Sequence, residues 1–367
     1  MSDDKVVIVS AKRTPIGSFQ GNFESVKATE LGSRVIERNI NDISINPKEI
    51  DETIMGCVLP AGLGQAPARQ AAMGAGIPSE SGATTINKMC GSGMKSIMFG
   101  HDSIKAQQNN IVVAGGLENM TNAPYILSKA RKGFRMGHSD VKDHMFLDGL
   151  EDAYEEGKLM GSFAEDTAEH YQFTREQQDN FAITSLERAK KANEDGTFES
   201  EIVPIKVLNR KNGTVTAANS SSISDGASSV ILMLESEAQK RGIKPLARII
   251  DHSTNSQEPK WFTTAPIGAI EKVLEKSGWK KTDVDLFEVN EAFAVVPMAV
   301  MKDIGISNDI LNIYGGACAL GHPVGASGTR IVTTLINALK KNNLKKGVAS
   351  LCIGGGEATA LTLEIIN

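Results

Sequence analysis

The sequence lacks the signatures of several protein classes. No two of its four cysteines form a C-x-x-C pair, so neither a common structural zinc motif nor a thioredoxin-like redox pair is indicated. Long apolar runs are also missing, since no stretch approaches the roughly 20 apolar residues that a membrane-spanning helix needs. Basic residues are outnumbered by acidic ones, and the net charge of −5 argues against nucleic acid as the main partner.

The composition and the first residues indicate a cytoplasmic globular protein. At 367 residues, with 41% hydrophobic and 23% charged residues, the chain is long enough for two or three domains with a large core. The polar start, Met1 to Lys5, leads directly into an apolar stretch and has no features of a signal peptide. A reducing compartment would keep all four cysteines free. We therefore expect a cytoplasmic location, with no membrane partner and no nucleic-acid partner.

The most informative stretch surrounds Cys90. The small residues Gly91, Ser92 and Gly93 follow the cysteine and leave no bulky side chain over its sulfur. Apolar residues then recur at the i, i+3, i+4 spacing of a helix. We expect Cys90 at a turn where a helix begins, because the free N–H groups and partial positive charge of a helix N-terminus favour a thiolate. A buried, unreactive cysteine beside a glycine turn is the alternative.

Apolar strands and amphipathic helices alternate along the chain, which is typical of α/β architecture. In the first half, strands are predicted at 6–9, 50–58 and 111–116, and helices at 29–41 and 67–76. The continuously apolar run at 111–116 favours a mostly parallel sheet that is buried on both faces. Residues 121–222 are richer in charge, with a helix at 175–194, and we expect an inserted loop or lid domain there.

The second half of the chain repeats the pattern of the first. An acidic lead precedes a strand at 283–290 as it does at 49–56, and a glycine-rich segment opens the helix 329–340 before a strand at 347–353. The sequence therefore predicts two similar α/β halves that face each other, with the ligand site at their junction. We expect an N-terminal half from residues 1–120 plus 223–245, an inserted domain from 121–222, and a C-terminal half from 246–367.

Polar residues of the second half are the expected partners of Cys90. His322 lies in a glycine-rich turn, Cys352 ends a buried strand just before Gly354, and Asn290 follows another strand. Each has an ordinary alternative, as a buried histidine, a core thiol or a helix cap. Because all of them lie where a strand ends, we predict that they form one constellation with Cys90.

Several segments of the chain resemble the thiolases, most closely the short-chain, biosynthetic acetyl-CoA acetyltransferases. The resemblance covers almost the whole chain, and its motifs occur in this order: NKMCGSG at 87–93, GGLENM at 115–120, NEAFA at 290–294, GHPVGASG at 321–328 and CIGGG at 352–356. It implies a thiolase-like fold of duplicated α/β halves, layered αβαβα, with an inserted loop domain.

The resemblance also implies a role for each catalytic candidate. Cys90 would take an acetyl group from acetyl-CoA, His322 would activate Cys90, and Cys352 would deprotonate a second acetyl-CoA. One oxyanion hole would use His322 with a water held by Asn290, and the other the N–H groups of Cys90 and Gly354. The expected reaction is a reversible Claisen condensation of two acetyl-CoA molecules, with no metal and no redox cofactor.

The similarity further implies which residues contact the acyl-CoA substrates, namely Ser221, Met160, Leu159, Phe293, Ala292 and Phe262. Leu159 stands where the family has a histidine, and Phe262 stands where short-chain thiolases more often carry methionine. Two aromatic rings at the acyl end would restrict the pocket to short chains. Thiolases usually have a longer segment before residue 213, so that segment is either absent from this protein or missing from the printed sequence.

Other functions remain open at this point. A thiolase of broader chain length, acting in fatty-acid β-oxidation, would use the same groups. A ketoacyl synthase typically supplies two histidines where this chain has His322 and Cys352, and a catalytically silent relative would be expected to have lost one of the reactive residues. The glycines 354–356 open no phosphate-binding helix, which argues against a dinucleotide-binding dehydrogenase. By resemblance we expect a homotetramer, a dimer of dimers, with residues 129–138 near the tetramer contact.

Overall fold

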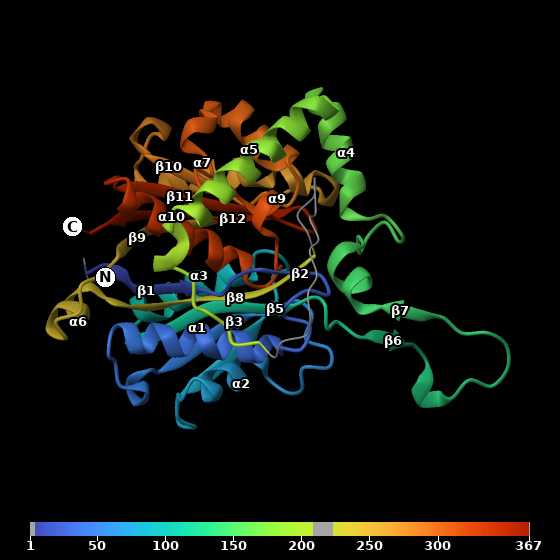
Figure 1. Cartoon of the computed structure of the whole chain (residues 1–367), viewed down its shortest axis with the longest axis horizontal. Helices are drawn as coiled ribbons and strands as arrows, with labels where there is room; N and C mark the ends of the chain where they lie inside the picture. The colour runs from blue at the N-terminus through green and yellow to red at the C-terminus, as the bar shows by residue number, and fades with distance from the viewer. Residues whose placement is uncertain (1–3, 208–222, 367) are drawn as a thin grey trace.

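The computed structural model describes residues 4–207 and 223–366 (Figure 1). Its strands are β1 (Val6–Arg13), β2 (Gly17–Ser18), β3 (Glu52–Gly56), β4 (Gly82–Ile86), β5 (Ile111–Asn119), β6 (Tyr125–Leu127), β7 (Val141–Asp143), β8 (Ser224–Leu234), β9 (Ala247–Ser256), β10 (Leu286–Val289), β11 (Lys346–Ile353) and β12 (Glu357–Ile365). Its α-helices are α1 (Ala28–Asp42), α2 (Pro67–Gly74), α3 (Ser92–Lys105), α4 (Met160–Tyr171), α5 (Arg175–Glu194), α6 (Glu235–Lys240), α7 (Ala265–Ser277), α8 (Val295–Val300), α9 (Ala317–Leu320) and α10 (Ser327–Lys341). None of the helices in these ranges is long and apolar enough to cross a bilayer.

Three buried hydrophobic clusters lie between the layers of helices and strands. Helices α1 and α2 pack on the outer face of β1, β3, β5 and β8, and α7 and α8 pack on the outer face of β10, β11 and β12. Helices α3 and α10 lie between the two halves of the sheet, where Met94, Ile97, Ile331 and Leu335 share one cluster with strands of both halves. The predicted αβαβα layering is therefore present, and the inner faces of both halves meet across α3 and α10.

The strand pairing differs from the mostly parallel sheet that we predicted. The main path runs β10-β11-β12-β9-β1-β8-β5-β3-β4, and only β3 with β4, β3 with β5 and β10 with β11 pair in parallel among the strands described. Strand β12 returns antiparallel to β11 because Gly355 and Gly356, with φ of +93° and +86°, make a turn too short for a crossover. Strand β8 enters antiparallel between β1 and β5 after the inserted segment.

Several elements begin and end at or near the residues that local sequence signals predicted. Helix α5 covers the predicted range 175–194 and begins with a capping box, in which the Gln177 N–H donates to Oγ1 of Thr174 at 3.2 Å and the Thr174 N–H donates to Oε1 of Gln177 at 2.9 Å. Helix α1 is one residue longer at each end than predicted, and β3 is shorter than the predicted 50–58. Caps and turns act over a few residues, so they set these ends directly.

Residues 121–207 are added to the outside of the layered body. They include the β6–β7 hairpin, which projects from the molecule, and helices α4 and α5, which lie against its C-terminal half (Figure 1). Large apolar side chains on and around the hairpin are exposed to solvent, namely Tyr125, Leu127, Phe134, Met136 and Val141. The domain boundaries named above stay a prediction.

Candidate active site

Cys90 lies in the turn between β4 and α3. Helix α3 starts at Ser92, so the cysteine is immediately before the helix, where its sequence placed it. Met89 has a φ of +46°, a left-handed conformation that residues other than glycine seldom adopt and that clusters at functional sites. Oγ of Ser92 accepts from the Lys88 N–H at 2.8 Å and donates to the Met89 carbonyl at 2.7 Å, which holds the turn.

The cysteine turn packs against the end of β11. A Cβ atom at Gly91 would lie only 2.3 Å from Cδ1 of Ile353, so any larger residue would have to push the end of this side chain aside. The backbone N–H groups of Gly354 and of Cys90 itself donate to the thiol sulfur. Burial raises the pKa of Cys90 to about 11, and these two N–H groups oppose the rise. The resting thiol is therefore protonated at neutral pH and needs a base.

The hydrogen bonds of His322 assign its tautomer. Oγ of Ser327 donates to the Pro323 carbonyl at 3.0 Å, so the same oxygen accepts the hydrogen bond from Nδ1–H of His322 at 2.5 Å. Nε2 then carries the lone pair, and the side-chain amide of Asn290 lies 3.4 Å from it. Burial, and next the charge of Arg330, lower the pKa of His322 to about 3. The imidazole is neutral at physiological pH, with its basic nitrogen beside Asn290.

The second thiol and the glycine after it complete the cluster. Cys352 is buried, and its pKa is raised chiefly by burial and also by the charge of Cys90. Val324, in the His322 loop, belongs to a buried cluster against which Cys90 packs, so the loop lies beside Cys90. The structure thus brings together Cys90, Cys352 and Gly354, and next to them the pair His322 and Asn290.

A buried carboxylate joins the two halves at this site. Glu118, at the end of β5, accepts backbone N–H groups from Val58 at 2.9 Å, Leu59 at 3.1 Å and Gly325 at 3.0 Å. Burial raises the pKa of Glu118 to about 7, and these N–H groups oppose the rise. Gly325 belongs to the His322 loop, so Glu118 fixes that loop to the N-terminal half. Our sequence analysis assigned no role to Glu118, although a carboxylate in an apolar strand was a usable signal.

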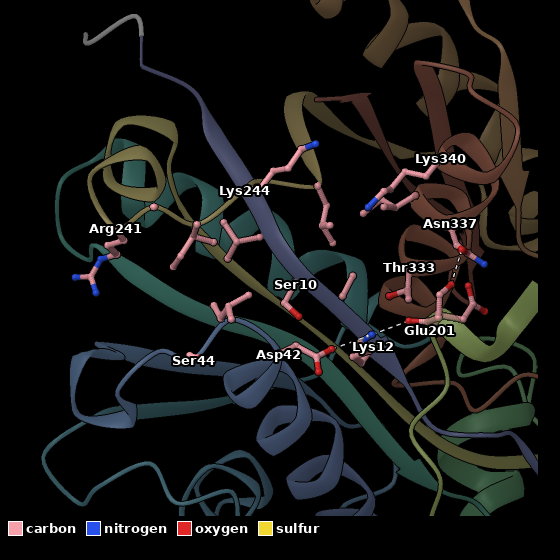
Figure 2. A pocket seen from close by; sticks show the side chains of 18 residues that line it. Ser10, Lys12, Asp42, Ser44, Glu201, Arg241, Lys244, Thr333, Asn337 and Lys340 are labelled. Carbon is pink, nitrogen blue, oxygen red and sulfur yellow. Dashed lines mark hydrogen bonds and ion pairs between the residues drawn. The ribbon is translucent and has the colours of Figure 1, made fainter. Parts of the chain in front are cut away.

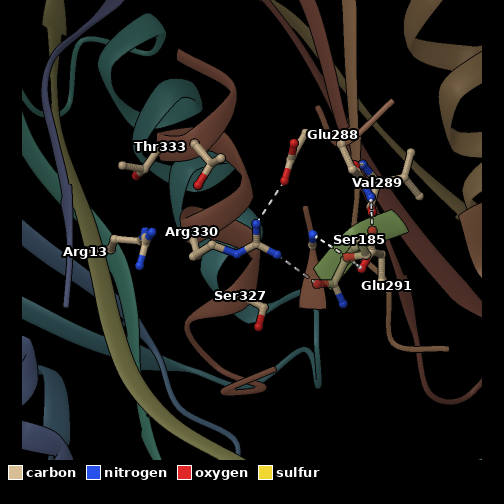
Figure 3. A network of polar contacts seen from close by, with 12 residues as sticks. Arg13, Ser185, Glu288, Val289, Glu291, Ser327, Arg330 and Thr333 are labelled. Atoms are coloured by element: carbon tan, nitrogen blue, oxygen red, sulfur yellow. Dashed lines mark hydrogen bonds and ion pairs between the residues drawn. The ribbon is translucent and has the colours of Figure 1, made fainter. Parts of the chain in front are cut away.

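A second network of buried charges, around Arg330, Glu288 and Glu291 (Figure 3), contacts Asn290. Nη1 of Arg330 donates to Glu288 at 2.9 Å, and Nη2 donates to Oδ1 of Asn290 at 3.4 Å. The neighbouring Glu291 accepts hydrogen bonds from the Ser185 hydroxyl, the Asn312 amide and the Cys318 N–H. Asn290 is not a helix cap, because α8 begins only at Val295. The network instead orients its amide toward His322.

The residues expected at the acyl end of the substrate lie together beside Cys352. Phe262 and Ala292 are buried in the same cluster as this thiol, and Met160 and Phe293 pack against the cluster. The rings of Phe262 and Phe293 meet edge to face with centroids 6.5 Å apart. A Cβ atom at Gly354 would lie 3.5 Å from Sδ of Met160, which places the start of α4 over the turn at Gly354.

One further expected contact lies elsewhere. Leu159 precedes α4 and is 41% exposed, so it lies outside the buried cluster. Ser221 falls outside the described residues. A separate groove of about 630 Å³, lined in part by Lys12, Lys244 and Lys340, lies between β1 and α10 (Figure 2). None of the described candidate residues lines this groove, so it is not the site built around Cys90.

Comparison with known proteins shows the family of this chain. The family model "Thiolase, N-terminal domain" matches residues 6–212, and "Thiolase, C-terminal domain" matches residues 243–365. The chain belongs to the thiolase family. A probable acetyl-CoA acetyltransferase from Dictyostelium discoideum is 47% identical to this thiolase, with 98% of this chain and 94% of the relative covered.

Solved structures of thiolases share the whole fold. The crystal structure of the Bacillus anthracis acetyl-CoA acetyltransferase superposes with a TM-score of 0.95 at 37% identity and covers 99% of both chains. A thiolase from Ascaris suum, crystallised in complex with coenzyme A, gives a TM-score of 0.92 at 39% identity, with 99% of this chain and 100% of that chain covered. The predicted fold class is therefore confirmed, and the constellation around Cys90 lies within a thiolase scaffold.

Proposed function

We propose that this thiolase is an acetyl-CoA C-acetyltransferase, an acyltransferase that interconverts two acetyl-CoA molecules with acetoacetyl-CoA and free CoA. One observation carries the proposal: the Cys90 sulfur receives the N–H of Gly354, and Gly354 follows the second thiol, Cys352, by two residues. A nucleophile, an oxyanion site and a separate acid/base are what this condensation requires. The names of the similar proteins support the same reaction.

In the first step, Cys90 attacks the thioester carbon of acetyl-CoA. Nε2 of His322 takes the thiol proton, since this nitrogen carries the lone pair of a neutral ring. The backbone N–H groups of Cys90 and Gly354 stabilise the negative oxygen of the tetrahedral intermediate. The bond to the CoA sulfur then breaks, the departing thiolate takes the proton of Cys352, and an acetyl group stays on Cys90.

In the second step, the Cys352 thiolate removes a proton from the methyl carbon of a second acetyl-CoA. The enolate oxygen faces the protonated Nε2 of His322 and a water held by Asn290, and the enolate carbon attacks the acetyl group on Cys90. Collapse of this intermediate releases acetoacetyl-CoA, and His322 returns its proton to Cys90. The protons balance over the cycle, and these steps use no metal and no redox cofactor.

The test is thiolysis of acetoacetyl-CoA by the purified protein. Loss of acetoacetyl-CoA and formation of acetyl-CoA are expected when free CoA is present and not when it is left out. The Cys90→Ala variant, checked for folding by circular dichroism, serves as the control and should be inactive. A wild-type protein that leaves acetoacetyl-CoA unchanged in the presence of CoA would refute the proposal.

The proposal includes a homotetrameric assembly, a place in lipid metabolism and a cytoplasmic location. Exposed apolar side chains on the β6–β7 hairpin support a contact between chains. The four free cysteines are consistent with a reducing compartment. Fractionation of the source cells, followed with an antibody, would test the location.

A further inference from the structure

A group of potential metal ligands lies far from the reactive cysteines. His101 and Asp102 are near the end of α3, and His252 is on β9. At 1.5 Å per residue, His101 is about 14 Å along the helix from Ser92, next to the nucleophile. None of the catalytic steps described above uses these side chains.

The three ligand atoms of this cluster converge on one point. Nδ1 of His101 lies 3.0 Å from Oδ1 of Asp102, and Nε2 of His252 lies 2.9 Å from the same oxygen. All three atoms lie within 4.8 Å of one another, and the two rings meet edge to face with centroids 5.0 Å apart. In a tetrahedral zinc site with bonds of about 2.1 Å, ligand atoms are about 3.4 Å apart, so small side-chain rotations suffice to admit an ion.

We propose that His101, Asp102 and His252 bind a divalent transition-metal ion, with Zn²⁺ the best fit and water completing its coordination. Imidazole nitrogens favour Zn²⁺, Cu²⁺ or Ni²⁺ over Mg²⁺ and Ca²⁺, which prefer oxygen ligands. The two histidine side chains are 16% and 14% exposed and that of Asp102 is 55% exposed, so the ion can enter from solvent.

Two lysines flank the cluster, and each also holds a neighbouring backbone or carboxylate group. Nζ of Lys105 donates to the Asp4 carbonyl at 2.8 Å. Nζ of Lys276 donates to Oδ1 of Asp251 at 2.9 Å and to the His252 carbonyl at 2.7 Å, which also fixes the backbone of β9 beside the ligand. Since α3 follows Cys90 and β9 belongs to the other half of the sheet, a bound ion would clamp the two halves together.

Isothermal titration of the chelator-treated, untagged protein with Zn²⁺ tests the site, and Co²⁺ gives an optical spectrum of the ligand set. We expect one ion per chain for the wild type, and at least about tenfold weaker binding for His252→Ala and for Asp102→Asn. His138→Ala removes an exposed histidine elsewhere and should change nothing. Asp102→Asn keeps the shape of the side chain, so its loss of affinity would not reflect misfolding.

Two further readouts separate this site from the reactive thiols. The Co²⁺ complex should lack the intense near-ultraviolet charge-transfer band of a thiolate ligand, and saturating Zn²⁺ should raise the Tm of the wild type but not of His252→Ala. The proposal is overturned if wild type binds no Zn²⁺, if His252→Ala binds Zn²⁺ as tightly as wild type, or if a thiolate band dominates. The thiolysis assay is independent of all three results.

Discussion

At the scale of single residues, the two thiols of the site have different surroundings. The Cys90 sulfur accepts hydrogen bonds from two backbone N–H groups and lies beside the loop that carries the neutral His322. Cys352 is instead enclosed in the apolar cluster around Phe262. Burial raises the pKa of both thiols, so neither is a ready thiolate in the resting protein. Reactivity must therefore arise from proton transfer to a neighbour during the reaction, and not from a preformed ion pair.

This state predicts how Cys90 reacts with an alkylating reagent. Because the pKa of Cys90 is about 11 and that of His322 about 3, the thiol and the imidazole are both neutral between these values. The rate of alkylation by iodoacetamide should rise about tenfold per pH unit from pH 6 to 9, followed by mass spectrometry of the Cys90 peptide. A rate that levels off below pH 8 would instead indicate a thiolate–imidazolium pair.

The two thiols should be separable by mutation. The variant Cys352→Ala keeps Cys90 and its N–H donors, so brief exposure to labelled acetyl-CoA should still leave the label on the Cys90 peptide. Carbon–carbon bond formation should fall by about 100-fold or more, because the base for the second acetyl-CoA is missing. Retained condensation activity would remove Cys352 from the mechanism, and label found on Cys352 in the wild type would reverse the assignment.

At the scale of elements, the decisive connection is between β5 and the loop that precedes α10. Glu118 holds this loop through Gly325 and holds the segment after β3 through Val58 and Leu59. The position of His322 therefore depends on a carboxylate from the other half of the molecule.

Removal of this carboxylate should destabilise the fold measurably. Glu118→Ala leaves three buried N–H groups without an acceptor, at about 1–3 kcal/mol each, so we expect a loss of at least about 3 kcal/mol in urea unfolding. In Glu118→Gln the amide oxygen can take the place of Oε2 and accept from the Val58 and Gly325 N–H groups, so this variant should lose less stability. The exposed Glu187→Ala is the control, expected within about 0.5 kcal/mol of wild type. Equal stability of Glu118→Ala and wild type would contradict this role.

Phe262, before α7, and Phe293, before α8, are expected to limit the length of the acyl chain. Phe262 and Phe293 fill the cluster beside Cys352, and each further methylene would forfeit about 0.8 kcal/mol of burial and add about 1–3 kcal/mol of overpacking. Acetoacetyl-CoA should therefore be cleaved at least about tenfold faster than 3-ketohexanoyl-CoA, compared by kcat/KM.

The variants Phe262→Ala and Phe262→Met should reduce the difference in kcat/KM between acetoacetyl-CoA and 3-ketohexanoyl-CoA. Methionine is the conservative replacement. Phe262→Ala is also expected to cost about 3–5 kcal/mol of stability, because the ring is buried. If wild type cleaves 3-ketodecanoyl-CoA as efficiently as acetoacetyl-CoA, the protein is a thiolase of broad chain length and the pocket assignment is wrong.

At the scale of the whole molecule, the β6–β7 hairpin is the feature that the single chain leaves unexplained. It projects from the layered body (Figure 1), and Met136 near its tip is 98% exposed. Apolar side chains gathered on a projecting arm indicate a contact with another chain.

Polar substitutions on this arm should therefore change the assembly. Phe134→Ser with Met136→Ser is expected to halve the mass measured by light scattering, from tetramer to dimer, without changing the circular dichroism spectrum. Leu186→Ser, on the exposed face of α5, is the matched control and should leave the mass unchanged. A double variant that keeps the mass of the wild type would exclude the arm from the tetramer contact.

Much of this protein is determined by short-range features of its sequence. The capping box at Thr174 sets the start of α5, the glycines after Cys90 set the start of α3, and the glycines after Ile353 set the turn into β12. These signals act between residues a few positions apart, so they can be read without knowing the fold. The reactive residue types and the family likeness could be read in the same way.

Only the tertiary structure decided how these pieces combine. The antiparallel position of β8, the loop anchored by Glu118, the tautomer of His322 and the cluster of His101 with His252 all depend on groups that are distant in sequence. Burial and hydrogen-bond partners, which set each pKa, are likewise contributed by other elements. The sequence therefore determined which chemical groups this thiolase carries, whereas packing across its two halves decided their protonation and their partners.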